Sequence, residues 1–164
     1  MNAEITTNWR ARLIAYAPLF LWMAVVLSLS FGEASMSETS RIIRPILKFL
    51  FPAAPEATIT AYHAFIRKSA HFTEYAILAF FAVRAFSAAS VNFIKNNRFW
   101  LAVALVVLVA ATDEFHQSFE ATRTGSIHDV LLDATGGITM VFLYWLITRH
   151  HSHHSVESGL GEPE

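Results

Sequence analysis

The sequence predicts an all-α fold: a polytopic membrane bundle of about four transmembrane helices, with a short interfacial helix between the first two. Composition is the first reason, because 54% of the 164 residues are hydrophobic and only 15% are charged, unlike a typical soluble domain. The length of the apolar stretches is the second reason, because several of them approach the roughly 20 apolar residues that a helix needs to cross the hydrocarbon layer. Polar segments separate these stretches and divide the chain into successive spans.

The length and charge of the chain narrow the possibilities further. No Pro/Gly/Ser-rich linker divides it, so we predict one transmembrane domain over residues 1–149, followed by a polar, His-rich and disordered tail over residues 150–164. The formal net charge of −1 gives no reason to expect a nucleic-acid partner. Cysteine is absent, which excludes disulfides, thiolate metal ligands and a cysteine nucleophile.

The first predicted span covers residues 13–31, which include no charged side chain. Arg10 and Arg12 precede it like the basic flank of a signal peptide, but the apolar run is long for a signal core, so we predict a retained anchor. Residues 32–62 follow, where large apolar side chains alternate with basic ones at helical spacing. That pattern is typical of a short helix lying on the membrane surface.

The other three spans are predicted over residues 69–90, 99–117 and 127–148, and each has polar side chains near one end. In an up-and-down bundle, the start of the second span, the end of the third and the start of the fourth share one membrane face. This geometry gathers a polar cluster of twelve residues: Arg67, Lys68, His71, Glu74, Tyr75, Asp113, Glu114, His116, Gln117, Arg123, Asp129 and Asp133.

The orientation of the bundle follows from its basic residues. They are slightly more numerous in the segments that are cytoplasmic when the N-terminus is inside. The polar cluster is then expected at the extracytoplasmic side of the membrane.

Helical spacing predicts that the polar side chains converge, with Asp113, His116 and Gln117 on one face of the third span. A carboxylate costs about 2.5 to 3.5 kcal/mol at the bilayer centre and less near the interface, so the five acids of the cluster need compensation. Ion pairs with Lys68 and Arg123, neutral carboxylates or a bound cation would each supply it. No metal-ligand spacing is diagnostic, so the sequence assigns no metal ligand, and the cofactor stays unknown.

Two interpretations of the cluster remain open. It could be a hydrogen-bonded plug that fixes helix register without any chemistry. The interpretation we favour is a site for a polar headgroup, an ion or a proton, because ionisable residues inside membranes are usually functional.

The same residues resemble a known pattern. The stretch Lys68-Ser-Ala-His71-Phe-Thr-Glu74-Tyr75, then Asp113-Glu114-Phe-His-Gln117, then Arg123-Thr-Gly-Ser126 and Asp129-Val-Leu-Leu-Asp-Ala-Thr-Gly136 are similar to the VanZ-like family. The resemblance covers residues 67–146. It departs from the family pattern at Ala121-Thr122, where a Pro-Gly is usual, and at Asp133, where an asparagine is usual.

The resemblance implies a multi-pass protein of the bacterial cytoplasmic membrane, related to one associated with low-level resistance to the glycopeptide teicoplanin. It also implies substrate-binding residues at the matching positions, to which Asp133 is added from the polar cluster: Lys68, His71, Glu74, Tyr75, Asp113, Glu114, Gln117, Arg123, Ser126 and Asp129. The expected partners are the lipid bilayer and a cell-wall or lipid-linked headgroup.

Two other functions stay open from the sequence. One is an intramembrane hydrolase or transferase acting on a lipid-linked phosphate, whose candidate catalytic residues would be Glu74, Asp113, Glu114, His71 and His116. The other is a small ion- or proton-coupled carrier or an accessory subunit. A homo-oligomer is a further alternative, with contact through Gly136-Gly137.

Overall fold

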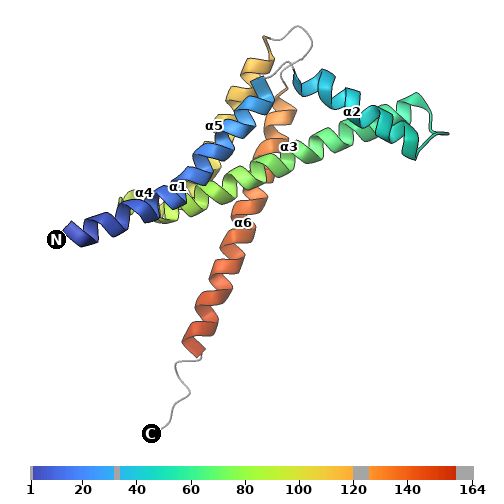
Figure 1. Cartoon of the computed structure of the whole chain (residues 1–164). Helices are drawn as coiled ribbons and strands as arrows, with labels where there is room; N and C mark the ends of the chain where they lie inside the picture. The colour runs from blue at the N-terminus through green and yellow to red at the C-terminus, as the bar shows by residue number, and fades with distance from the viewer. Residues whose placement is uncertain (1, 32–33, 120–125, 158–164) are drawn as a thin grey trace.

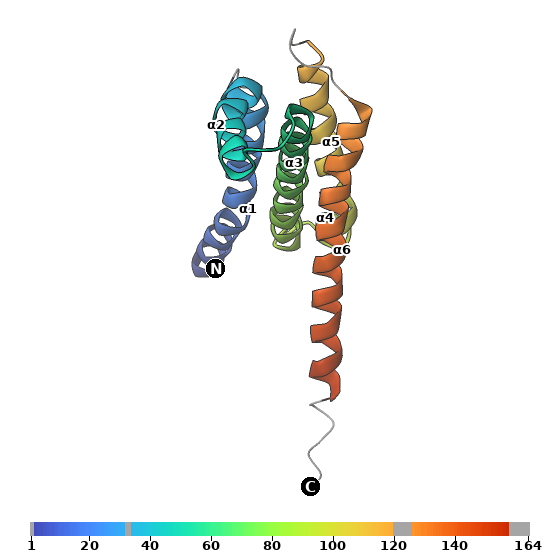
Figure 2. The same cartoon turned by 90° about the vertical axis from the view of Figure 1, so that its right-hand side faces the viewer.

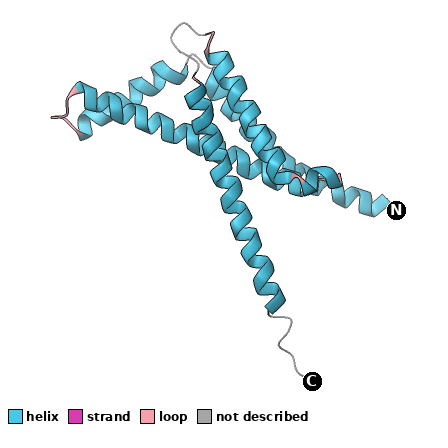
Figure 3. Ribbon diagram, turned by 180° about the vertical axis from the view of Figure 1, so that it is seen from behind, coloured by secondary structure: helices cyan, strands magenta, loops and turns pink. Residues whose placement is uncertain are grey.

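The structure is a computed structural model that describes residues 2–31, 34–119 and 126–157. Its elements, in chain order (Figure 1), are the helices α1 (Asn2–Phe31), α2 (Ala34–Leu50), α3 (Glu56–Ser87), α4 (Asn92–Asn96), α5 (Arg98–Gln117) and α6 (Ile127–Glu157). Helices and short loops account for all of the described residues, without a strand (Figure 3). The predicted all-α class is therefore confirmed.

Three helices are long and apolar enough to cross a membrane within the described residues: Trp9–Leu29 of α1, Arg98–Gln117 of α5 and Ile127–Arg149 of α6. The long helix α3 is not among these three, and it carries the polar residues at the start of the expected second span. However, α3 packs against α1, α5 and α6. The beginning of α1 and the end of α6 lie toward the same side of the molecule (Figure 2), as an even number of crossings requires. This arrangement agrees with the prediction of about four spans.

The helix boundaries differ from the sequence-based ones in two places. Helix α3 begins at Glu56 rather than at residue 69, because hydropathy marks the apolar part of a helix and not its first turn. Helix α6 continues to Glu157, into the segment expected to be disordered. The polar segment between the second and third predicted spans contains the short helix α4.

Helix α2 forms where the interfacial helix was predicted, and it is attached to the first turns of α3. Arg44 donates a hydrogen bond of 2.8 Å to Glu56, which also pairs with Lys48. The rings of Phe51 and Tyr62 lie 5.3 Å apart. These contacts explain why the polar beginning of α3 is helical.

The core of the bundle is apolar and surrounds α3. Leu78, Ala79 and Val83 of α3 are fully buried, together with Val106 of α5 and Val26 of α1. The indole nitrogen of Trp22 in α1 also donates a hydrogen bond of 2.9 Å to the backbone carbonyl of Glu74. Helix α3 is thus the central element that fixes the positions of the others.

Two glycines let α6 approach its neighbours closely. A Cβ atom on Gly136 would collide with the backbone carbonyl of Phe72, and one on Gly137 would lie 2.6 Å from a methyl group of Val106. Both glycines are buried between helices of the same chain. The Gly136-Gly137 step therefore packs α6 against α3 and α5 of the same chain. A homo-oligomer stays a prediction.

Candidate functional site

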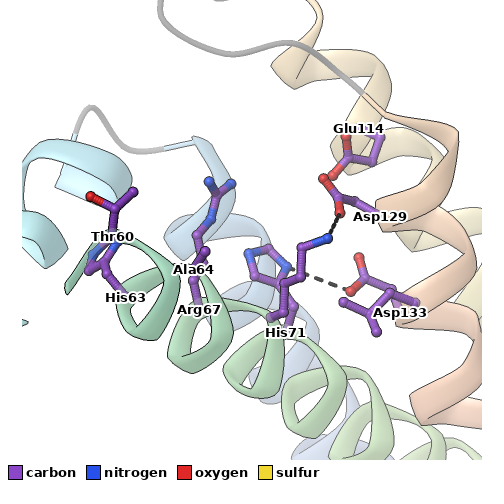
Figure 4. A pocket seen from close by; sticks show the side chains of 10 residues that line it. Thr60, His63, Ala64, Arg67, His71, Glu114, Asp129 and Asp133 are labelled. Carbon is purple, nitrogen blue, oxygen red and sulfur yellow. Dashed lines mark ion pairs between the residues drawn. The ribbon is translucent and has the colours of Figure 1, made fainter. Parts of the chain in front are cut away.

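A pocket of about 160 Å³ opens where α3, α5 and α6 meet, near the end of α5 and the start of α6 (Figure 4). Helix α3 forms one wall, and α5 and α6 form the other. The lining residues are Thr60, His63, Ala64, Arg67, Lys68, His71, Glu114, Asp129, Leu132 and Asp133.

The wall formed by α3 follows from helical periodicity. Its lining residues recur every three or four positions, which places them on one face of the helix. Two of them, Arg67 and Lys68, are basic, and His63 and His71 are imidazoles. One turn beyond His71 the same face continues with Tyr75, which is fully buried. The face therefore changes from a basic, open end to a closed apolar core.

The wall formed by α6 presents carboxylates one turn apart, and each meets a side chain of α3. Lys68 Nζ lies 3.5 Å from Asp129 Oδ1, and His71 Nδ1 lies 3.7 Å from Asp133 Oδ1 (Figure 4). Successive turns of α3 and α6 therefore face each other along the pocket. Asp129 is partly exposed, whereas Asp133 is 0% exposed, so polarity continues from the pocket mouth into the interior.

Helix α5 contributes its last two turns, where Asp113, Glu114 and Gln117 are buried. Glu114 Oε2 accepts a hydrogen bond of 2.8 Å from the backbone N–H of Ser126. A carboxylate at the start of a helix is favourable, because the N-terminus of α6 carries a partial positive charge. The Tyr75 hydroxyl donates a hydrogen bond of 3.4 Å to Asp113 Oδ2.

The structure brings most of the predicted site residues together. Lys68, His71, Tyr75, Asp113, Glu114, Asp129 and Asp133 all lie in or directly beside the pocket. Glu74 is half-buried one turn after His71, and Ser126 is half-buried at the start of α6. Arg123 lies outside the described residues.

One prediction about the third span is wrong. His116 was expected to share a face with Asp113 and Gln117, but its side chain is exposed, while Glu114 takes the place beside them. The reason is the direction in which the buried face of α5 is turned. This face extends from Asp113 toward Glu114, on the side away from His116.

The sequence interpretation missed Thr60, His63, Ala64 and Leu132 as lining residues. The first three lie upstream of residue 69, where the span was expected to begin. Continuing the i, i+3, i+4 spacing backwards from Lys68 and His71 would have found them. His63 also approaches Ser40 of α2, with 3.5 Å between Nε2 and Oγ, so α2 lies close to the outer end of the pocket.

Comparison with known families adds one finding to this geometry. The family model described as VanZ/LLP1 matches residues 13–148. The chain belongs to the VanZ/LLP1 family. The match confirms the resemblance seen over residues 67–146 and extends it through α1, and together with the three apolar helices it indicates a multi-pass membrane protein. No curated protein and no solved structure matches the chain.

The arrangement of charges decides what the pocket of this VanZ-family protein can do. Basic groups of α3 face carboxylates of α5 and α6 across a small volume that also has apolar lining from Ala64 and Leu132. Such a site can bind a small polar group that carries negative charge, with the basic wall on one side of it. It can also hold a proton or a cation between the buried carboxylates.

Proposed function

We propose that this VanZ-family protein binds the anionic headgroup of a cell-envelope lipid, such as a lipid-linked phosphate, in the pocket between α3 and α6. Binding would change the composition or accessibility of the cell surface and so affect susceptibility to a glycopeptide such as teicoplanin. With the N-terminus inside, as the basic residues favour, the pocket faces the extracytoplasmic leaflet of the bacterial cytoplasmic membrane.

The observation that carries this proposal is the weak pairing of Lys68 at the pocket wall. Its side chain is 60% exposed, and its ammonium group lies 3.5 Å from Asp129, beyond the usual length of a charge-assisted hydrogen bond. An exposed pair of this kind contributes little to stability. Lys68 can therefore turn toward a phosphate at small cost, beside the guanidinium of Arg67 in the same wall.

The surroundings of the pocket suit a ligand that keeps its chains in the bilayer. Phe65 and Ile66, next to the lining residues of α3, are exposed, and so is Leu131 beside Leu132 in α6. Apolar side chains that face lipid on both sides of a polar pocket would let acyl or prenyl chains remain outside while the headgroup enters.

Binding to lipid nanodiscs with and without a polyprenyl phosphate tests the proposal. Replacing a charged hydrogen-bond partner costs about 1.5 to 3 kcal/mol, so we expect Lys68→Ala to weaken binding of the phosphate lipid by roughly tenfold or more. Lys95→Ala is the matched control, because Lys95 is exposed on α4 at the far end of α3 and should bind like the wild type. Equal affinity for nanodiscs with and without the phosphate lipid would refute the proposal.

The effect on susceptibility is tested in cells. Strains with and without the gene are compared for growth under teicoplanin, and the gene encoding Lys68→Ala is added back. We expect loss of the gene to change sensitivity and Lys68→Ala to fail to restore it. Unchanged sensitivity across strains would remove the resistance part while leaving headgroup binding intact.

A second candidate function is favoured by the buried acids beside the pocket. Carboxylates at short range can split their pKa values and supply one acid and one base, so turnover of a lipid phosphate is a reasonable alternative. Glu114→Gln keeps an oxygen that can accept the Ser126 N–H but removes the charge. Loss of turnover in this variant would support an enzyme, and the absence of turnover by the purified wild type would argue against one.

A further inference from the structure

Behind the pocket, three side chains from three helices meet in the interior. His71 of α3, Asp113 of α5 and Asp133 of α6 each offer a nitrogen or carboxylate oxygen, and these three atoms all lie within 4.8 Å of one another. Both aspartates are 0% exposed, and His71 is half-buried. We refer to these residues as the buried triad.

Four polar atoms of the buried triad lack a hydrogen-bond partner among the described residues. His71 Nδ1, Asp113 Oδ1 and both carboxylate oxygens of Asp133 are buried and accept or donate no hydrogen bond within the described residues. The 3.7 Å between His71 Nδ1 and Asp133 Oδ1 exceeds hydrogen-bond length. Buried carboxylates without partners are strongly unfavourable, above all in a membrane protein.

The basic side chains nearby do not supply the missing charge. In the ranges that the structure covers, neither aspartate of the buried triad forms an ion pair with a lysine or arginine, and Lys68 is directed to Asp129 instead. A protonated His71 would bring one positive charge against two carboxylates. The unpaired oxygens therefore point to a positively charged ligand.

We propose that the buried triad binds a divalent cation, of the class represented by Zn²⁺ and Mn²⁺. One imidazole nitrogen with two carboxylates is a ligand set for zinc and related metals, whereas Ca²⁺ and Mg²⁺ prefer oxygen ligands alone. Ligand atoms about 2.0 to 2.2 Å from a tetrahedral zinc lie roughly 3.5 Å apart. The three side chains thus need to approach one another by only about 1 Å.

One neighbour of the buried triad, Tyr75, serves as an orienting residue. Its hydroxyl donates to Asp113 Oδ2, which leaves Oδ1 of the same carboxylate for the ion. Such outer hydrogen bonds are a usual part of metal sites, since they hold the ligands in place.

The pocket gives the cation access and an open coordination position. His71 and Asp133 line the pocket, whereas Asp113 lies behind them. An ion held by all three would therefore lie at the pocket floor with one side toward the cavity, where water or an anionic oxygen can bind. The role of that position in holding a phosphate rests on the proposed function, but the cation site itself does not.

Metal binding to the full chain in detergent tests this inference. The protein is purified without an oligohistidine tag, and four tail histidines are replaced by asparagine in every sample so that they add no sites: His150, His151, His153 and His154. After chelator treatment, Zn²⁺ or Mn²⁺ alone is titrated, with no phosphate lipid present. We expect about one ion per chain, and a rise in the thermal unfolding midpoint on metal addition.

The controls separate loss of a ligand from loss of the fold. Replacing an outer-shell residue commonly costs 10- to 100-fold in metal affinity, so Asp133→Asn should weaken binding by at least roughly 100-fold. Asp129→Asn removes a carboxylate one turn away that pairs with Lys68, and it should bind metal like the wild type. His71→Gln repeats the test should Asp133→Asn not give a monodisperse helical protein.

Three results would overturn the cation site: less than a tenth of an ion per wild-type chain at micromolar free metal, unchanged binding in Asp133→Asn and His71→Gln, or equal loss in Asp129→Asn. The phosphate-lipid assay is run separately on metal-free and metal-loaded protein. Failure of headgroup binding with intact metal binding counts against the proposed function alone, and the reverse result counts against the cation site alone.

Discussion

Replacing Gly136 by alanine tests how tightly α6 must approach α3 for the bundle to form. The added Cβ would collide with the carbonyl group of Phe72, which is backbone. A backbone carbonyl inside a helix cannot rotate away as a side chain can. The whole of α6 must therefore move outward from α3 before the methyl group fits.

The size of the effect follows from a comparison with the next residue. Overpacking a tight interior costs typically about 1 to 3 kcal/mol, and we expect Gly136→Ala near the upper end, at about 3 kcal/mol. Gly137→Ala would meet a methyl group of Val106 at 2.6 Å, which a small side-chain shift can relieve, so we expect about 1 kcal/mol. Alanine favours the helix over glycine by up to about 1 kcal/mol, but this gain is the same in both variants and cancels in their difference.

The assay is reversible unfolding in mixed micelles, followed by helical circular dichroism, for the wild type and the two variants. The expected order of unfolding free energy is wild type, then Gly137→Ala, then Gly136→Ala, with the two variants about 2 kcal/mol apart. Because Gly136 lies one turn after Asp133, we also expect Gly136→Ala to separate the buried triad and weaken metal binding. A Gly136→Ala protein at least as stable as Gly137→Ala would refute the close approach of α6 to the Phe72 backbone.

Two further predictions concern the attachment of other helices to α3. Trp22→Phe removes the hydrogen bond from the indole to the carbonyl of Glu74, so the free energy of unfolding should fall by about 0.5 to 1.5 kcal/mol. Trp100→Phe, at an exposed position, is the control and should change the free energy of unfolding little in the same assay. Equal effects of the two substitutions would count against the hydrogen bond. The ion pairs with Lys48, and secondarily with Arg44, hold the pKa of Glu56 below its ordinary value of 4.5. The stabilisation from these ion pairs is therefore fully present above pH 4.5. It is lost as the pH falls through the lower pKa that Glu56 has in the folded state. Spin-label distances between α2 and α3 should therefore increase at acid pH in the wild type and be insensitive to pH in Glu56→Gln; an unchanged distance in the acidified wild type would contradict this.

The membrane helices could be predicted from the sequence because the relevant signal is local. An uncharged run long enough to cross the bilayer forms a helix there, since backbone groups in lipid must be satisfied internally. The beginning of α3 could not be predicted in this way. Its first turns are polar, and their helical state depends on tertiary contacts, with Glu56 paired to α2 and the ring of Tyr62 tilted against that of Phe51.

The site was predicted in part for a similar reason. Counting residues per turn brought the polar ends of α3, α5 and α6 to one face, and the structure places Lys68 opposite Asp129 and His71 opposite Asp133. The partners themselves could not be deduced, because they depend on the rotation and height of α6 against α3. Those are fixed by the contact of Gly136 with the backbone of Phe72, which only the folded chain reveals.

The depth of the polar groups explains how one bundle can contain both a pocket and an apolar core. Asp113 lies four residues before the end of α5 at Gln117, or roughly 6 Å along the helix. Carboxylates are less costly there than at the bilayer centre, and water or an ion can reach them through the pocket. Two turns deeper the interior is apolar, with Leu78 and Val106 almost fully buried. Moving the buried triad one turn inward would close it to ions and leave its charge without compensation, so its position near the helix ends is what makes a charged ligand possible.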